Sequence, residues 1–213
     1  MRRFPENDAE RQEAASKVRF GLTGTPEPVI VAFIQERFAP LDDAWNQRCR
    51  QVQNAMAIEA NAADALGAAR EAANTAARQL ANSLIDPMGR IDHTTRQAVF
   101  GTGLGDLLKV NVHRFLTSCQ DALVWLAARP NTAHDEGARL ALEEQLPLLI
   151  AARDAHQSAQ ANLKEARSAA IHARSQWDAG YRKLARQIEA LTSGDEWKLY
   201  LATFVDEKPV VVL

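Results

Sequence analysis

Apolar residues recur at heptad spacing over two long stretches of this sequence, residues 41–84 and residues 147–192. In the first stretch, the steps between apolar positions alternate between three and four residues, which places one apolar stripe along a helix. The stretch contains one glycine, Gly67, and no proline. Because its commonest residue is alanine, the best helix former, the pattern predicts a long uninterrupted helix.

The second stretch has the same repeat, with leucine at most of the positions that recur every seven residues from Leu142 to Leu191. The two stretches have nearly equal lengths, so we expect them to pair as a long antiparallel coiled-coil hairpin. Residues 85–146 then form a helical insert, which either sits at the tip of this stalk or folds back along it as a bundle. The predicted seam of the hairpin consists of Val52, Met56, Leu66, Leu80, Leu149, Leu163, Trp177, Leu184 and Ile188.

Aligning the two stretches end to end gives a definite register for the hairpin. In this register Met56 faces Trp177. Glu59 interrupts the apolar seam and falls close to Arg174. Charged pairs at such positions fix the register of coiled coils, so the sequence predicts an ion pair between Glu59 and Arg174.

The N-terminal region predicts short elements. Residues 8–16 are expected to be helical, and the alternation of Val18, Phe20 and Leu22 with polar or small residues predicts a strand. A short helix over residues 27–38 is expected to end at Pro40, since proline cannot continue a helix.

The C-terminal region predicts a β-hairpin. Residues 197–204 alternate in polarity, residues 206–209 resemble a turn, and three valines follow. Together the termini, 1–40 plus 193–213, are expected to form a small α+β lobe. The predicted fold is therefore mainly α, with a stalk of 41–84 plus 147–192 between this lobe and the insert.

The insert contains an amphipathic helix, predicted over residues 104–128, whose apolar face is wide enough to require burial. A further short helix is expected from about Asp135. Pro147 lies within a helical pattern, so it is expected to kink the chain or to begin a new helix.

Composition and charge exclude several classes of protein. The net charge of −2 gives no general attraction to nucleic acid. Cys49 and Cys119 lie outside any CxxC or Cys/His cluster, which argues against a disulfide framework or a zinc site and suits the cytoplasm. The sequence predicts no transmembrane helix, and its first residues do not resemble a secretory signal, although export without such a signal stays an alternative.

No catalytic, cofactor or metal site is predicted. Gly101, Gly103 and Gly105 precede a helix and resemble a phosphate-binding loop, but they lack the spacing of a dinucleotide fingerprint and the Gly-Lys-Ser/Thr of a P-loop. The histidines form no Glu-x-x-His pair of the kind that binds metals in helical bundles. Cys119 lies on an apolar helix face, where a thiol usually serves packing.

These features favour a non-enzymatic interaction or scaffold protein that presents end lobes on a coiled-coil stalk. Its expected partners are proteins, including a second copy of the same chain. Two alternatives stay open. One is a membrane-active, toxin-like bundle that contacts the membrane surface through the 104–128 helix. The other is a nucleotide- or phosphate-binding protein that uses the loop from Gly101 to Gly105.

Overall fold

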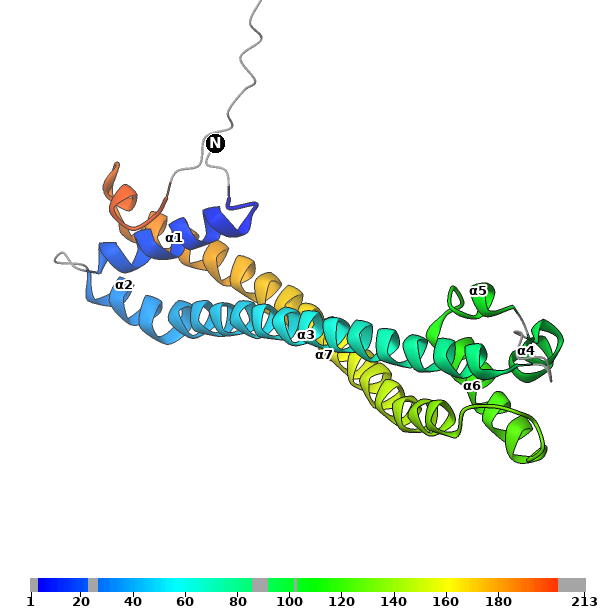
Figure 1. Cartoon of the computed structure of the whole chain (residues 1–213). Helices are drawn as coiled ribbons and strands as arrows, with labels where there is room; N and C mark the ends of the chain where they lie inside the picture. The colour runs from blue at the N-terminus through cyan, green and yellow to red at the C-terminus, as the bar shows by residue number, and fades with distance from the viewer. Residues whose placement is uncertain (1–3, 23–26, 86–91, 102, 203–213) are drawn as a thin grey trace, which may run out of the picture. The chain divides into compact units, whose positions relative to one another are not determined.

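The structure, a computed structural model, describes residues 4–22, 27–85, 92–101 and 103–202. It is mainly helical, as predicted, and no strand occurs within these residues (Figure 1). Two long helical runs dominate it. The first comprises α2 (Pro28–Phe33), the π-helical turn η1 (Ile34–Phe38) and α3 (Ala39–Ser83), and the second is α7 (Glu136–Leu191). The two runs pack together, which confirms the prediction of two long paired helices.

Pro40 does not end the first run, contrary to the prediction. The helix instead widens into the π-turn η1 directly before it, where the N–H of Ala39 donates to the carbonyl of Ile34. Proline lacks an N–H and its ring crowds the preceding turn. The wider turn, with bonds from residue i to i+5, accommodates this loss without breaking the helix.

Pro147 likewise does not begin a new helix, because α7 continues through it from Glu136. The short helix expected from Asp135 and the long heptad helix are therefore one element. The first turns of α7 are reinforced by Arg139, which forms ion pairs with Glu136 at 2.6 Å and Glu143 at 2.9 Å. Side chains spaced three and four residues apart support a helix in this way.

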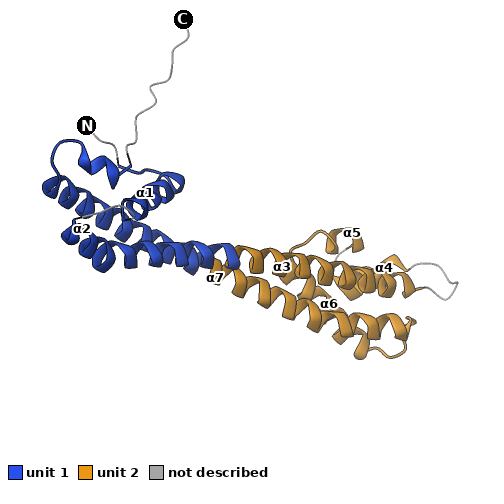
Figure 2. Ribbon diagram, turned by 90° about the vertical axis from the view of Figure 1, so that its left-hand side faces the viewer, with its two compact units in different colours: residues 1–54, 164–213 blue, residues 55–163 orange. Residues whose placement is uncertain are grey.

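The described chain divides into two compact units, each with its own core (Figure 2). Unit 1 contains residues 1–54 and 164–213, and unit 2 contains residues 55–163. Unit 2 is thus one continuous segment between the two parts of unit 1. The division follows the two cores, whereas the predicted three-part division followed the expected ends of the helices.

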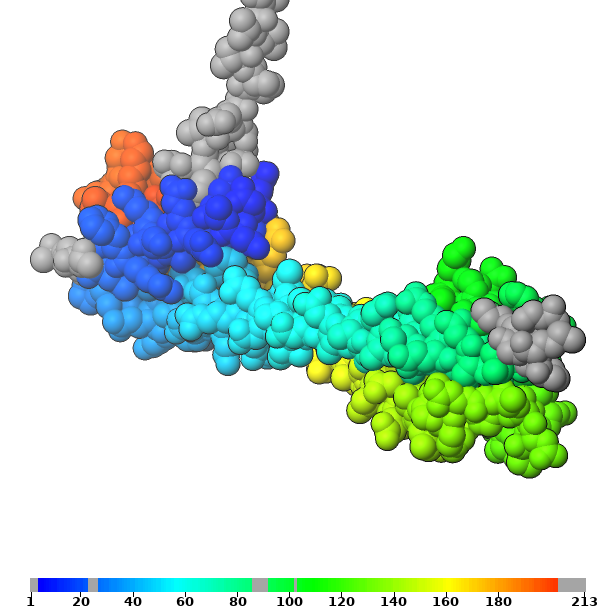
Figure 3. Space-filling model, viewed as in Figure 1, coloured from blue at the N-terminus to red at the C-terminus, as the bar shows by residue number. Residues whose placement is uncertain are grey.

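Unit 1 is built around the start of α3 and the end of α7, with α1 (Asp8–Gly21) packed on them (Figures 1 and 3). The strand predicted at 18–22 is wrong, because residues 18–21 continue α1 and Leu22 is its C-cap. Asn7 caps the helix through its side chain, and the buried residues of α1 follow helical spacing: Arg11, Ala14, Ala15 and Val18. This spacing outweighs the short alternation that suggested a strand.

The C-terminal β-hairpin is not supported. At the start of the segment predicted as its first strand, 197–204, the chain forms the 3₁₀ helix η2 (Glu196–Leu199). Tyr200, Leu201 and Ala202 are then buried in the core of unit 1. The remainder of the predicted hairpin, residues 203–213, lies outside the described residues.

Unit 2 packs α4 (His93–Phe100), α5 (Leu104–Leu107) and α6 (Val112–Ala127) with the end of α3 and the start of α7. The single helix predicted over 104–128 is therefore two helices. Asn111 separates them because its side chain accepts a hydrogen bond from the N–H of Arg114 and caps α6. Phe115, Cys119 and Leu126 bury the apolar face of α6 in the core of this unit.

The pairing register within each unit differs from the predicted one. In unit 1, the Trp177 ring lies 5.7 Å from the Trp45 ring at an interplanar angle of 50°, and its Nε1 donates to Asp42 at 2.9 Å. In unit 2, His156 Nε2 lies 3.1 Å from Glu59 Oε1. Trp177 therefore meets Trp45 instead of Met56, a displacement of 11 residues, and Glu59 meets His156 instead of Arg174, a displacement of 18 residues.

Six of the nine predicted seam residues are buried. Val52 and Leu66 are half-buried, whereas Met56 is 48% exposed. The residues with at most 8% exposure are Leu80, Leu149, Leu163, Trp177, Leu184 and Ile188.

Candidate binding grooves

Unit 1 carries an open groove where α1 begins, between α3 and α7, which we call the α1–α3–α7 groove. Its volume is about 520 Å³. The lining residues are Asp8 and Gln12 from α1, Trp45, Cys49, Val52 and Gln53 from α3, and Arg167, Ala170, Ile171 and Arg174 from α7. All of them belong to unit 1.

The floor of this groove is apolar. Trp45, Cys49 and Val52 are spaced four and three residues apart, so they lie on one face of α3. Ala170 and Ile171 contribute from α7, and Ile171 is 68% exposed. The floor is open because α1, which covers α3 and α7 farther along, starts only at Asp8.

The first turn of α1 is held to α7 by charged side chains. Arg11 is buried and donates from Nε and Nη2 to the two carboxylate oxygens of Asp178, at 2.8 and 2.9 Å. Arg174 Nη2 donates to the backbone carbonyl of Glu6 at 3.1 Å. Such a two-pronged guanidinium–carboxylate contact fixes orientation as well as distance. The α1 side of the groove is therefore preformed.

Asp42 connects α1, α3 and α7 through hydrogen bonds. Its carboxylate is 1% exposed and accepts from Trp177 Nε1 at 2.9 Å and from the guanidinium of Arg19. Trp177 belongs to α7 and Arg19 to α1, so one side chain of α3 connects all three elements. A buried carboxylate is tolerated only with such partners.

Cys49 places a thiol in the groove wall. Burial, together with the negative charge of Asp8, raises the pKa of this thiol. A raised pKa keeps a cysteine protonated at neutral pH and disfavours nucleophilic chemistry. Cys49 thus supplies a small apolar contact surface to the floor of the groove.

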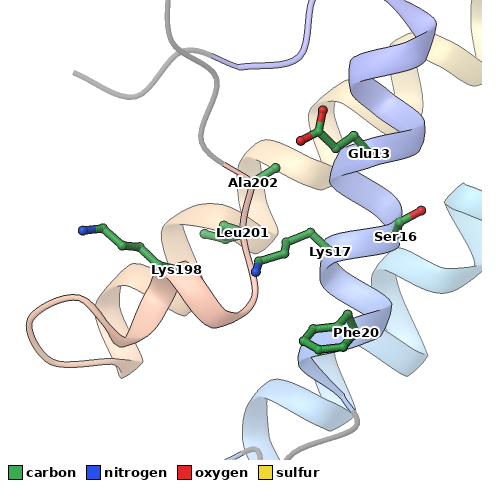
Figure 4. A pocket seen from close by; sticks show the side chains of 7 residues that line it. All are labelled: Glu13, Ser16, Lys17, Phe20, Lys198, Leu201 and Ala202. Carbon is green, nitrogen blue, oxygen red and sulfur yellow. The ribbon is translucent and has the colours of Figure 1, made fainter.

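A second groove of about 720 Å³ lies between α1 and η2 with the residues that follow it (Figure 4). Lys17 and Lys198 line it, Lys17 pointing toward Leu201 and Lys198 pointing away from α1, and 68% of the surface of Phe20 is exposed. Both lysine side chains already have contacts within the protein. Lys198 pairs with Asp195 at 2.7 Å, and Lys17 Nζ lies 5.7 Å from the centre of the Phe20 ring.

In unit 2, Arg70 is the most unusual polar residue. Its guanidinium lies 3.6 Å from the centre of the Phe115 ring, and its Nη2 donates to the carbonyl of Val110 at 3.2 Å. Burial lowers its pKa. The neighbouring Cys119 is fully buried, and this burial raises the pKa of its thiol to about 12. The contacts tie α6 to α3 and form no open site.

The glycine-rich segment has a structural role. Gly101 ends α4 in the left-handed conformation, with φ of 68°, and Gly103 is the N-cap of α5. Gly101 therefore occupies a C-cap position where a residue without Cβ is favoured. The α5 helix that follows has only four residues, too few to present a substantial helix dipole to a phosphate.

Glu59 and Arg174, predicted to pair, lie in different units. In unit 2, Glu59 pairs with His156, which also lies 3.2 Å from Gln160. In unit 1, Arg174 binds the carbonyl of Glu6. The Glu59–Arg174 ion pair would join the two units and stays a prediction.

The described residues hold neither a cluster of metal ligands nor a helix able to span a membrane. No three His, Cys, Asp or Glu side chains there converge as metal ligands. None of the helices in this part of the chain combines the length and apolar character needed to cross a bilayer. No protein-family model matches the sequence, and no curated protein or solved structure is significantly similar to it.

Sequence reasoning missed the α1–α3–α7 groove. The heptad pattern placed Trp45, Cys49 and Val52 on the closed seam of a two-helix stalk, where no groove would exist. The available signal was Ile171, a large apolar residue next to the seam position Ala170 and three or four residues from Arg167 and Arg174. A single exposed apolar residue is common on protein surfaces, so this signal alone does not predict a groove.

Proposed function

We propose that this protein is a non-enzymatic interaction protein whose α1–α3–α7 groove receives a helix of a protein partner. The observation that carries the proposal is the uncovered floor beside α1. Helix α1 buries Ala14, Ala15 and Val18 in the core formed with α3 and α7. Beyond its first residue, Asp8, the apolar surface continues through Val52 and Ile171.

A second helix in line with α1 would extend an interaction that unit 1 already makes. Binding of an amphipathic helix in an apolar groove is a common mode of recognition, with apolar anchors three or four residues apart. The spacing of Trp45, Cys49 and Val52 on α3 matches that periodicity. The raised pKa of the Cys49 thiol further argues for contact rather than chemistry at this site.

The proposal is tested by titrating the isotopically labelled full chain with designed amphipathic helical peptides and following amide chemical shifts. We expect the shifts to concentrate on residues that line the groove. Ile171→Ala should weaken binding by about tenfold, because a central apolar anchor contributes more than 1 kcal/mol.

The matched control is Ile58→Ala. Ile58 is also well exposed, at 59%, but belongs to α3 in unit 2 and does not line the groove. The control should bind like the unchanged protein. Equal affinities for all three proteins, or shifts confined to unit 2, would refute the proposed site.

A further inference from the structure

We infer that the α1–α3–α7 groove selects an acidic amphipathic helix, an inference that rests on the proposed function and names the class of partner. The argument begins with the charges on α7. Arg167 and Arg174 line the groove one heptad apart, with Ile171 between them. Residues at these spacings share one face of a helix, so the groove wall presents two cations around an apolar anchor.

Two acidic groups near this wall, Asp178 and Asp8, share one cation, Arg11. Asp178, one turn beyond Arg174, binds Arg11 through both carboxylate oxygens. Asp8 lies 3.3 Å from the same guanidinium. Lys164, one turn before Arg167, is exposed and adds a third positive charge to this face of α7. The face therefore keeps a positive excess although the whole chain carries a net charge of −2.

Arg167 is the group most open to a partner. It is exposed and, among the described residues, has no hydrogen bond or ion pair. Arg174 is anchored to the carbonyl of Glu6 through Nη2, which holds its guanidinium at the groove edge. Guanidinium groups bind carboxylates through two parallel hydrogen bonds, so these positions favour Glu or Asp on the partner.

The spacing predicts the pattern of the partner. Acidic residues about one heptad apart would face Arg167 and Arg174, and apolar residues on the same side would cover Ile171, Val52 and Cys49. Charges at the edge of an interface mainly determine which partner binds and how fast, whereas the apolar floor supplies affinity. Selectivity for acidic helices should therefore weaken as salt concentration rises.

The test uses two designed helical peptides with identical leucine positions. One carries Glu at the flanking positions and the other carries Lys. Each is titrated into the full chain at low and high salt by fluorescence anisotropy. We expect the Glu peptide to bind at least about tenfold more tightly at low salt, and the difference to shrink at high salt.

Thiol labelling gives an independent readout of where the peptide binds. The Glu peptide should slow maleimide modification of Cys49, which lines the groove, and leave Cys119, which is buried in unit 2, unchanged. Mass spectrometry of proteolytic fragments distinguishes the two labelled cysteines, so neither has to be substituted.

Charge reversal identifies the residue responsible. Arg167→Glu should reduce the preference for the Glu peptide by about tenfold. Lys183→Glu is the matched control, because it makes the same charge change at an exposed position of α7 outside the groove. A similar loss in both variants would attribute the effect to net charge and refute the inference.

The outcomes separate this inference from the proposed function. Equal binding of the Glu and Lys peptides would leave helix docking in place and overturn the acidic selectivity. Absence of binding by either peptide would overturn both. A further outcome is that, without any peptide, maleimide modification of Cys49 slows as the protein concentration is raised. That result would identify a second copy of the chain as the occupant and overturn the acidic-partner inference.

Discussion

Asp42 illustrates how one buried polar residue can determine which helices pack together. The carboxylate receives hydrogen bonds from Trp177 on α7 and Arg19 on α1. Leu41 and Trp45 on either side of it follow the heptad pattern, so the sequence predicts a helix here but gives Asp42 no partner. Its partners are determined by the register and by the position of α1, neither of which a heptad pattern specifies.

Replacing Asp42 should therefore destabilise unit 1. In Asp42→Ala the buried N–H of Trp177 loses its acceptor, whereas Arg19, which is largely exposed, can return to water. We expect a loss of about 2 kcal/mol in the free energy of unfolding, the usual cost of one unsatisfied buried donor. Urea denaturation followed by tryptophan fluorescence measures it. Asp43→Ala, at the exposed neighbouring position, should change stability little.

The two cysteines should report separately on the two units. Cys119 is fully buried and its pKa is raised to about 12, so at pH 8 the folded protein presents almost no thiolate there. Cys49 is only half-buried, in unit 1. We expect a thiol reagent at pH 8 to modify Cys49 in the native protein and Cys119 only after unit 2 opens.

Site-resolved mass spectrometry over a series of urea concentrations checks this order. The direction of the pH dependence follows from the protonation of the thiol. A raised pKa lowers the thiolate fraction at a given pH, so reaction of the native Cys119 should become appreciable only as the pH approaches that pKa. Rapid modification of Cys119 at pH 8 without denaturant would contradict the expectation.

At the scale of elements, the sequence predicted the long helices well and their pairing poorly. The heptad repeat indicated both helices because it repeats along the chain, and for the same reason it left their register open. The fixed register comes from singular contacts, such as Trp177 with Asp42 and His156 with Glu59. The α1–α3–α7 groove depends on that register and on where α1 begins, so it too could not be predicted from periodicity.

Leu142 and Leu140 in α7 provide a direct test of the observed core. Leu142 is fully buried in unit 2, whereas Leu140 is 45% exposed. Leu142→Ala should lower the free energy of unfolding by about 3 kcal/mol, as is typical when a buried leucine leaves a cavity. Leu140→Ala on the same helix should cost less than about 1 kcal/mol. Circular dichroism during urea denaturation compares the two, and equal losses would place the core elsewhere.

Pro147 is a tolerated defect in α7, and its replacement should stabilise the protein. Proline in a helix interior destabilises the folded protein by about 3 kcal/mol. Proline also restricts the unfolded chain, which offsets up to about 1 kcal/mol of this loss. Pro147→Ala is therefore expected to raise the free energy of unfolding by about 2 kcal/mol. Thermal and urea denaturation measure the change. A loss of stability would show that the residue is required for the path of the helix.

At the scale of the molecule, the chain builds two cores from the same pair of long helices. Unit 2 is formed by residues 55–163 alone, whereas unit 1 needs residues from both sides of that segment. The core of unit 1, for example, combines Trp45 with Trp177 and Leu184. Unit 2 can therefore form from one continuous segment, whereas unit 1 needs two segments that are distant in the sequence.

Fragments of the chain should reveal this difference. Residues 55–163 contain the whole core of unit 2, so this fragment is expected to be helical and to unfold cooperatively in urea. Residues 1–54 lack Trp177, Tyr181 and Leu184, and should show no cooperative transition. Adding residues 164–213 to them should restore helicity. A cooperative transition in the isolated 1–54 fragment would contradict the division.

The nesting of unit 2 within unit 1 also has a consequence during translation. The residues of unit 2 all emerge from the ribosome before Lys164, so that unit has its complete core available while the rest of α7 is still being made. The first 54 residues must meanwhile wait with Trp45 and Phe38 unburied. Until synthesis reaches the end of α7, this exposed N-terminal segment is the part of the nascent chain on which chaperones are expected to act.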